Sequence, residues 1–475
     1  MTSILAPDLL ILTTAFTAML CGAIFSKNRD SRIFKFTILG LLIAIAHLVF
    51  NPVKESSHLF HAYYFTETSR WLKIIFSSIA FFSIMFARSY FRESSHERGR
   101  LKHEGEFYAL ILFCTFGMFT VVSSNDLLTL FVGIELATIP LYALTAYYKH
   151  DNFSVEASTK YIIMGSVSTA IALFGYSFIY GAVGGIRFDE ISSFIAIQAN
   201  INDPLLWVGF FLILIAIGFK LAAAPMHMWA PDVYEGAPMP VVAFLSVGSK
   251  SLAVMILLIL LNGPFSGLRN GVLQFIIIVS ILSMTIGNLG ALKQKRLRRF
   301  MAYSSIAQTG YILLGFLGDD KLMFTSTIYY IIVYSVTNLC TFFIFSIVTN
   351  KRKDDFASLR GLSKQSPLLA AILMLCMFSL AGIPPLAGFT GKFFLFASAA
   401  QSGYYALIVF AALNSTISLY YYLLIIKEAY INKPEGKLEP IDIYFEQRWA
   451  LLILTIGVIS LGLIPCVTTG IASLN

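Results

Sequence analysis

Four charged side chains lie within long apolar stretches of this sequence, and they are the residues best suited to chemistry. They are one carboxylate, Glu135, and three amines, Lys220, Lys250 and Lys392. An unpaired charge at the centre of a bilayer costs at least about 2.5–3.5 kcal/mol, so such residues usually face a polar interior and mark ion or proton pathways. A lysine beside a carboxylate keeps its proton, whereas a lysine that loses its partner or its hydration releases the proton more readily. The four residues therefore predict proton transfer through charge pairs that open and re-form.

Three of these charges also have a structural interpretation. In that alternative Glu135 fixes helix packing by pairing with a lysine of a neighbouring helix; we favour a functional role because a buried ion pair rarely stabilises more than apolar packing does. For Lys220 and Lys250 the alternative is extension toward the membrane interface, although Lys250 is too central in its stretch for that. Lys73 stands beside Trp71 near the start of another apolar stretch, so we interpret it as an interfacial anchor.

Prolines interrupt two of the apolar stretches close to these lysines. Pro225 follows Lys220, and Pro384 and Pro385 stand among glycines shortly before Lys392. Proline removes a backbone donor and clashes with the preceding helical turn. A broken helix at membrane depth is tolerated where it lines a polar or water-filled cavity, so we expect both lysines to line such cavities.

Two further residues are secondary candidates. His227 lies just after Pro225 and either relays protons near neutral pH or makes a hydrogen bond at a helix end. Lys160, with Glu156 one turn before it, is either a solvated helix start or the cytoplasmic mouth of a path. The sequence leaves both alternatives open.

Membrane spans are the elements that must hold these residues. Hydrophobic residues make up 57% of the 475 and charged residues 13%, against about 45–50% and 25% in soluble chains. This excludes soluble multidomain, disordered, collagen-like, coiled-coil and disulfide-stapled proteins. Because one crossing takes roughly 20 apolar residues, the sequence predicts an all-α polytopic membrane protein with about fourteen transmembrane helices. Their expected ranges are 9–25, 33–50, 71–90, 107–124, 127–148, 161–181, 205–224, 239–262, 272–292, 301–317, 323–348, 367–400, 404–426 and 449–470.

The basic residues are distributed unequally over the loops between these spans. Alternate loops hold 25 Lys and Arg residues on one side and 5 on the other, and the richer side is normally cytoplasmic. We therefore expect both termini outside, and the net charge of +8 reflects topology. With a bacterial inner membrane as the default location, the outer side is the periplasmic side. The run from Lys293 to Arg299 is accordingly interpreted as a cytoplasmic hairpin rather than a nucleic-acid patch.

No residue pattern for a cofactor or metal is present. The cysteines lack the Cys-x-x-Cys spacing of metal and iron–sulfur sites, and no glycine-rich nucleotide loop follows a strand. The five cysteines are isolated from one another in the sequence, at Cys21, Cys114, Cys340, Cys376 and Cys466. We therefore expect the energy for proton movement to come from partner proteins.

The interrupted spans predict an internal repeat. The spans at 205–224 and 367–400 are five apart in the series and so cross the bilayer in opposite directions. Spans four to eight and nine to thirteen then form two inverted five-helix repeats, with helices seven and twelve broken, as in ion-coupled transporters. The expected divisions are 1–106 (three N-terminal helices), 107–262 (first half-channel), 272–430 (second half-channel) and 431–475 (cytoplasmic loop and last helix).

The contexts of these residues resemble a known family, the antiporter-like membrane subunits of proton-translocating NADH:quinone oxidoreductase (respiratory complex I), which are related to Mrp-type antiporter subunits. The resemblance is carried by Glu135 in Gly-Ile-Glu-Leu, by the run from Lys220 through His227 to Trp-Ala-Pro-Asp-Val-Tyr-Glu-Gly-Ala-Pro, by Lys250, by Arg299-Phe-Met-Ala-Tyr-Ser-Ser-Ile-Ala-Gln308 and by Gly382-Ile-Pro-Pro-Leu-Ala-Gly-Phe-Thr-Gly-Lys392.

The resemblance implies roles for the residues and for partners. Glu135 and Lys220 would form the ion pair of the first half-channel, Lys250 would connect the halves, and Lys392 would serve the second. Electrons would pass from NADH through FMN and iron–sulfur clusters on partner subunits to quinone, while this chain moves protons. The implied partners are neighbouring antiporter-like subunits and small helical subunits within the lipid bilayer.

Length and Lys392 together most resemble subunit N within this family. Two hypotheses of other classes stay open at this stage. One is an Mrp-type cation/proton antiporter subunit, driven by ion gradients and independent of NADH and quinone. The other is a membrane scaffold whose buried charges only fix helix packing.

Overall fold

Long apolar runs become helices in a membrane because a helix satisfies its backbone polar groups within one segment. Among the described residues, twelve helices are long and apolar enough to cross a membrane, and two shorter apolar helices accompany them. The chain is therefore an all-α, multi-span membrane protein, as predicted, while the count of fourteen spans and their inverted relation stay predictions. The computed structural model describes residues 2–24, 30–53, 57–59, 62–94, 104–197, 201–349, 353–434, 441, 443–463 and 470–471.

The helices are joined mostly by short turns. In chain order they are α1 (Thr2–Ile24), α2 (Asp30–Phe50), α3 (Glu67–Ser94), α4 (Glu104–Val122), α5 (Leu127–Thr145), α6 (Asn152–Val183), α7 (Phe188–Ala196), α8 (Pro204–Lys220), α9 (Trp229–Gly236), α10 (Met239–Phe244), α11 (Lys250–Asn262), α12 (Arg269–Leu292), α13 (Leu297–Leu314), α14 (Asp320–Thr349), α15 (Leu362–Gln365), α16 (Pro367–Ala381), α17 (Ala387–Gln401), α18 (Tyr405–Tyr430) and α19 (Phe445–Leu463).

Some residues used in the sequence predictions lie outside the described residues. They are Lys27, Arg29, Lys54, Arg98, Arg100, Lys102, Lys351, Arg352, Lys437 and Cys466.

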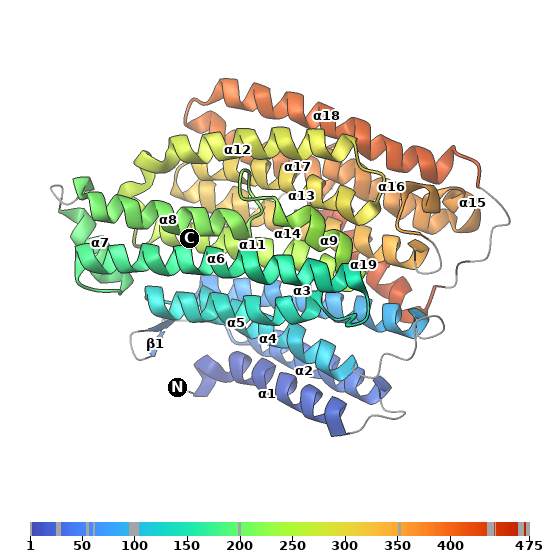
Figure 1. Ribbon diagram of the computed structural model, residues 1–475, viewed down its shortest axis with the longest axis horizontal. Helices are drawn as coiled ribbons and strands as arrows, with labels where there is room; N and C mark the ends of the chain where they lie inside the picture. The colour runs from blue at the N-terminus through green and yellow to red at the C-terminus, as the bar shows by residue number, and fades with distance from the viewer. Residues whose placement is uncertain are drawn as a thin grey trace.

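The helices lie side by side in one bundle (Figure 1), with α1 and α2 at one edge and α18 at the opposite edge. The burial of the spans identifies its centre. In the apolar 18-residue stretches of Met239–Asn262 and Leu297–Leu317, 94% of the residues are buried. The share is 89% in Asp320–Thr349 and only 28% in Asn152–Val183. The core therefore consists of α10, α11, α13 and α14, and α6 presents most of its surface to lipid or to partners.

Two helices are interrupted near the predicted prolines. α8 ends at Lys220, and α9 begins only at Trp229. α16 ends at Ala381, where Gly382 adopts the left-handed conformation (φ 88°) that glycine accommodates without strain. The helix resumes as α17 at Ala387. Each interruption exposes backbone carbonyls that the rest of the protein must satisfy.

A π-helical turn, Leu245–Ser249, joins α10 to α11 and ends directly before Lys250. Such turns are rare in proteins, and those that occur are often found at functional sites. All five of its residues are buried. The sequence carries no proline or other marker that predicts this turn, which changes the helical register just where the buried lysine begins α11.

A short antiparallel hairpin was not predicted. β1 (Ser57–Leu59) pairs with β2 (Tyr63–Phe65), and the N–H of Tyr64 donates to the carbonyl of Ser123 at 2.7 Å. The Tyr-Tyr-Phe segment has high strand propensity. The hairpin folds over the start of α3, beside the turn between α4 and α5.

Candidate functional site

Glu135 and Lys220 line one small cavity between α5, α6 and α8. Its volume is about 20 Å³, which is room for about one water molecule. The hydroxyls of Ser168 and Thr169 add polar groups to a lining that is otherwise largely apolar. The first interrupted helix therefore lines a small cavity whose polar groups are few, so the expectation of a polar or water-filled cavity stays a prediction.

The Glu135 carboxylate and the Lys220 amine each form a hydrogen bond with a threonine hydroxyl. Thr169 on α6 donates to Glu135 Oε1 at 3.0 Å, and Lys220 Nζ donates to Thr138 Oγ1 on α5 at 2.9 Å. Glu135 and Thr138 are three residues apart on α5 and so lie on one face of that helix. The direct ion pair between Glu135 and Lys220 that the resemblance implies is not formed in this structure.

Lys250 is 2% exposed and lies in the core. Its Nζ donates to the Ser305 carbonyl at 2.5 Å and to Thr309 Oγ1 at 3.0 Å, both on α13. Thr309 in turn donates to the Leu221 carbonyl at 3.0 Å, just after Lys220 at the first helix break. One threonine of α13 therefore connects Lys250 to the carbonyl that the break exposes.

The polar side chains of α13 continue toward the second break. Gln308 donates to Tyr422 Oη and to the Leu380 carbonyl, both at 3.2 Å, and accepts from Tyr330 at 2.5 Å. Tyr422 also bonds Ser304 at 2.5 Å. These residues form a satisfied polar layer between the two lysines of the core.

Lys392, on α17, is 4% exposed. Its Nζ donates to the Ala381 carbonyl at 3.1 Å and to Ser415 Oγ at 3.0 Å. The amine also stands 4.4 Å from the ring centroid of Tyr311 on α13, a distance at which a cation is attracted to the ring face. The second break thus supplies a carbonyl to Lys392, and α13 supplies a ring.

The core lysines share one electrostatic feature. Among the described residues, no carboxylate lies within ion-pair distance of Lys250 or Lys392. Their charge is held by carbonyl and hydroxyl dipoles and, at Lys392, by an aromatic face. A buried charge held in this way responds strongly to any charge that approaches or leaves nearby, because the local dielectric constant is low.

The secondary candidates occupy different places. His227 lies in the segment between α8 and α9, and its Nδ1 is buried with no hydrogen-bond partner among the described residues. Its carbonyl accepts the N–H of Ala230 at 3.0 Å, so the backbone of His227 supports the start of α9. Lys160 pairs with Glu156 and Asp232, both at 2.8 Å, and its side chain is 43% exposed.

A further buried ion pair was missed by the sequence analysis. Lys73 is fully buried, pairs with Asp8 at 2.7 Å and also bonds the Tyr63 hydroxyl. Our interpretation of Lys73 as an interfacial anchor is therefore wrong. The error arose because α1 begins at Thr2, seven residues before the predicted start at 9, which places Asp8 inside the helix.

The Lys293–Arg299 run also does more than mark topology. Arg296 and Arg299 pair with acids of α9, and Arg298 pairs with Asp354 at 2.7 Å. Partners so distant in sequence leave no local signal, although Asp232 and Glu235 stand three residues apart on one helix face.

No group of three or more His, Cys, Asp or Glu side chains capable of holding a metal ion occurs in the part of the chain that the structure describes. The site is therefore built from amines, one carboxylate, hydroxyls and backbone carbonyls. Groups of this kind hold and pass protons.

Comparison with known proteins places this arrangement in a family. Residues 124–418, more than half of the chain, match the family described as NADH:quinone oxidoreductase/Mrp antiporter, TM. The chain belongs to this family. The matched range includes Glu135, Lys220, Lys250 and Lys392, and the resemblance inferred from the sequence is confirmed.

Proteins from other organisms are similar to this chain over nearly its whole length. NADH-quinone oxidoreductase subunit N of Rhodospirillum rubrum is 35% identical over 440 residues, which cover 92% of this chain and 88% of that protein. A chain of respiratory complex I from Thermus thermophilus is 28% identical, with a TM-score of 0.82 and coverage of 99% and 100%. A chain of the Mrp complex from Dietzia sp. has a TM-score of 0.85 at 22% identity, with coverage of 100% and 97%; at that identity the likeness concerns the fold alone.

Proposed function

We propose that this chain translocates protons as a membrane subunit of an NADH:quinone oxidoreductase, using Glu135, Lys220, Lys250 and Lys392. One observation carries the proposal: a single core helix, α13, binds Lys250 through Ser305 and Thr309 and faces Lys392 with Tyr311. Buried amines without a counter-ion are costly, and apolar residues of similar volume would pack there at no such cost. Proton transfer gives these amines a reason to be present.

The proposed path has two halves. Residues 107–262 would form the first half-channel, where Glu135 and Lys220 face a cavity of about one water molecule. Residues 272–430 would form the second, around Lys392. Lys250 would join them, because Thr309 links its amine to the Leu221 carbonyl at the first break.

The proposed step is electrostatic. When Lys220 moves toward Glu135 across the small cavity, the positive field that it exerts on Lys250 changes, and the proton of Lys250 is released or retained accordingly. The resulting change in the electric field is transmitted to Lys392 through the polar layer of Gln308, Tyr330 and Tyr422. His227 and Lys160 would lie along proton access routes of the first half-channel.

The energy would come from other subunits. NADH, FMN, iron–sulfur clusters and quinone would be bound by partner subunits, in keeping with the relatives named above. Neighbouring antiporter-like subunits and small helical subunits would contact this chain within the bilayer. The distribution of basic residues supports an orientation with both termini on the outer side, which is the periplasmic side if the membrane is a bacterial inner membrane.

Substitution of the first pair tests the proposal. Glu135→Gln and Lys220→Met are to be made in the intact complex in its own membrane, and protons moved per electron transferred from NADH to quinone measured. We expect assembly to be retained and the proton-to-electron ratio to fall. Glu104→Gln is the matched control, because Glu104 is a buried carboxylate of α4 that pairs with Arg88 at 3.0 Å. It is not part of the buried row, by which we mean Glu135, Lys220, Lys250 and Lys392.

Other outcomes would favour the competing functions. An unchanged ratio at normal assembly in both test variants would favour a structural scaffold. Copurification of this chain with other antiporter subunits, without flavin or iron–sulfur proteins, would favour an Mrp-type cation/proton antiporter.

A further inference from the structure

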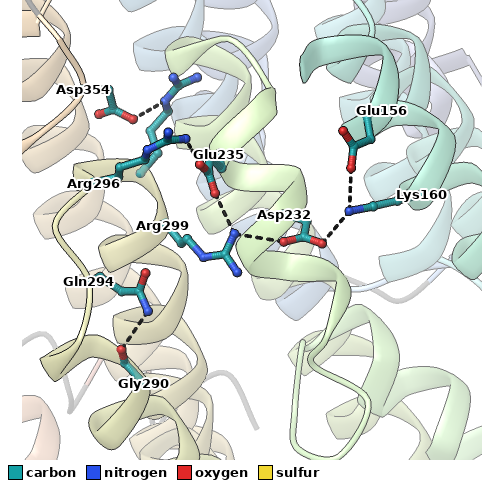
Figure 2. Close-up of polar contacts among 10 residues, drawn as sticks. Glu156, Lys160, Asp232, Glu235, Gly290, Gln294, Arg296, Arg299 and Asp354 are labelled. Atoms are coloured by element: carbon teal, nitrogen blue, oxygen red, sulfur yellow. Dashed lines mark hydrogen bonds and ion pairs between the residues drawn. The ribbon is translucent and has the colours of Figure 1, made fainter. Parts of the chain in front are cut away.

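The short helix α9 is held through its two acidic side chains. Asp232 and Glu235 stand three residues apart and face α13, where Arg299 Nη1 lies 3.0 Å from Asp232 Oδ1 and 2.6 Å from Glu235 Oε2. Figure 2 shows the guanidinium of Arg299 between the two carboxylates. One arginine therefore joins both acids of α9 to α13.

Lys160 extends this cluster to a third helix. Its Nζ lies 2.8 Å from Asp232 Oδ2 and 2.8 Å from Glu156 Oε1, so Asp232 is bound by α6 on one side and by α13 on the other (Figure 2). Neighbouring arginines strengthen the contact, since Arg296 pairs with Glu235 and Arg298 donates to the Ala237 carbonyl at the end of α9 at 2.7 Å.

The same helices carry the polar contacts of the buried row. α6 carries Thr169, which binds Glu135, and α13 carries Thr309, which binds Lys250. α9 begins directly after the first break, and the indole N–H of its first residue, Trp229, donates to the Phe219 carbonyl, one residue before Lys220, at 2.8 Å. A displacement of α9 would therefore also move the end of α8 at the first helix break.

Stability does not explain the cluster. The side chains of Arg299 and Glu235 are 33% and 16% exposed, and partly exposed ion pairs typically contribute about 0.2–1 kcal/mol each. A single nitrogen of Arg299, Nη1, binds both carboxylates, so its two N–H groups fix the separation of Asp232 and Glu235 instead. The cluster is better suited to fixing the relative positions of α6, α9 and α13 than to holding the protein folded.

We propose that Arg299 is a positioning residue for proton translocation, which binds Asp232 and Glu235 together and so couples movement at the first helix break to the helix that holds Lys250. This inference rests on the proposed function. Arg299 touches no residue of the buried row, so it acts through α9 and α13. Without it, α9 keeps its contacts with Arg296 and Arg298 but loses the bridge through Asp232. The first break then follows α13 less closely, and charge movement at Lys220 is transmitted less completely to Lys250.

The test compares three variants in the intact complex in its own membrane. Arg299→Ala removes the ion pairs that join Asp232 and Glu235 to α13. Arg299→Lys keeps the positive charge on a shorter, more flexible side chain, so it should recover part of the lost function. Arg360→Ala is the matched control, because Arg360 pairs with Glu428 at 2.9 Å with side chains 28% and 18% exposed, apart from α9.

The readout is the number of protons moved per electron, with assembly checked on native gels. We expect Arg299→Ala to lower this ratio about threefold or more, Arg299→Lys to lower it less, and Arg360→Ala to leave it unchanged. Adding Arg299→Ala to a chain that already carries Asp232→Asn and Glu235→Gln should lower it no further, since the partners are gone.

Three results would overturn the proposal: a normal ratio in assembled Arg299→Ala, equal loss in Arg299→Ala and Arg360→Ala, or full additivity in the combined variant. If Arg299→Ala fails to assemble, the Asp232→Asn, Glu235→Gln variant takes its place and must show the same loss.

Glu135→Gln is measured in the same experiment, to separate the positioning role from the proposed function. A lowered ratio there with a normal ratio in Arg299→Ala rejects only the positioning role, whereas normal ratios in both also reject the proposed function.

Discussion

Thr309 and Lys250 are joined by a 3.0 Å hydrogen bond in the core of the protein, and the threonine hydroxyl lies 3.0 Å from the Leu221 carbonyl at the first helix break. Lys250 supplies the proton of this bond, so the hydroxyl can donate its own proton to the Leu221 carbonyl or to the Ser305 carbonyl, which lies 3.1 Å away. The break and the central lysine thus share one side chain. A change in the charge of Lys250 alters the hydrogen bond that satisfies the break.

Removing that hydroxyl should impair proton movement. In Thr309→Val the side-chain volume is nearly kept, but Lys250 loses an acceptor and the Leu221 carbonyl loses a donor. Leaving a buried polar group unsatisfied costs about 1–3 kcal/mol. We expect a lowered proton-to-electron ratio and a lower unfolding temperature. Thr115→Val is the control, because Thr115 is fully buried and bonds the Ile111 carbonyl of its own helix; equal effects of the two substitutions would contradict a special role for Thr309.

The ring of Tyr311 should matter more than its hydroxyl. Lys392 Nζ stands 4.4 Å from the ring centroid, and the attraction between a cation and a ring is about 0.5–2 kcal/mol. Tyr311→Phe keeps the ring, whereas Tyr311→Leu removes it. We expect the phenylalanine variant to keep most of the pumping rate, and the leucine variant to lose about two- to thirtyfold. The prediction fails if the two variants pump equally well.

The Asp8–Lys73 pair should affect stability rather than pumping. Lys73 is fully buried, and removing one partner of a buried pair costs about 3–5 kcal/mol because the other charge stays buried and unpaired. Lys73→Met alone should therefore lower the thermal stability of the complex, while Lys73→Met with Asp8→Leu should recover much of the loss. A double variant less stable than both single variants would argue against this account.

Close helix contact at Gly287 should be sensitive to a single methyl group. A Cβ at Gly287, on α12, would lie 2.3 Å from the backbone nitrogen of Ala307 on α13. Gly287→Ala should therefore force α12 and α13 apart at a cost of about 1–3 kcal/mol and disturb the contacts of Lys250. Gly181→Ala is the control, because a Cβ there has no neighbour within 4 Å, and it should be neutral or slightly stabilising. Equal thermal stability of the two variants would refute the prediction.

The sequence predicted the all-α membrane fold because lipid leaves few alternatives. Apolar runs of span length must be helical, and the prolines near Lys220 and Lys392 stand where α8 and α16 give way to irregular backbone. The short hairpin β1–β2 and the π-helical turn before Lys250 were not predicted. Both depend on packing against distant segments, and neither has a strong local pattern.

For the candidate site, the sequence determined which charges stand inside apolar stretches, because the cost of burying a charge makes each one conspicuous. It did not determine their partners. Asp8 was excluded by a helix boundary misplaced by a few residues, and Arg299 was interpreted only as a topology signal. Those partners lie dozens of residues away, as in the pairing of Lys73 with Asp8 and of Arg299 with Asp232.

The sequence alone therefore determined the membrane fold and the identity of the central charges, since both follow from the free energy of transferring side chains and backbone into lipid. Only the tertiary structure decided that Glu135 and Lys220 face one cavity without a direct bond, and that α13 serves both Lys250 and Lys392. These relationships depend on how helices distant in sequence pack, and hydrogen bonds between such helices form only when packing has set their rotation and depth.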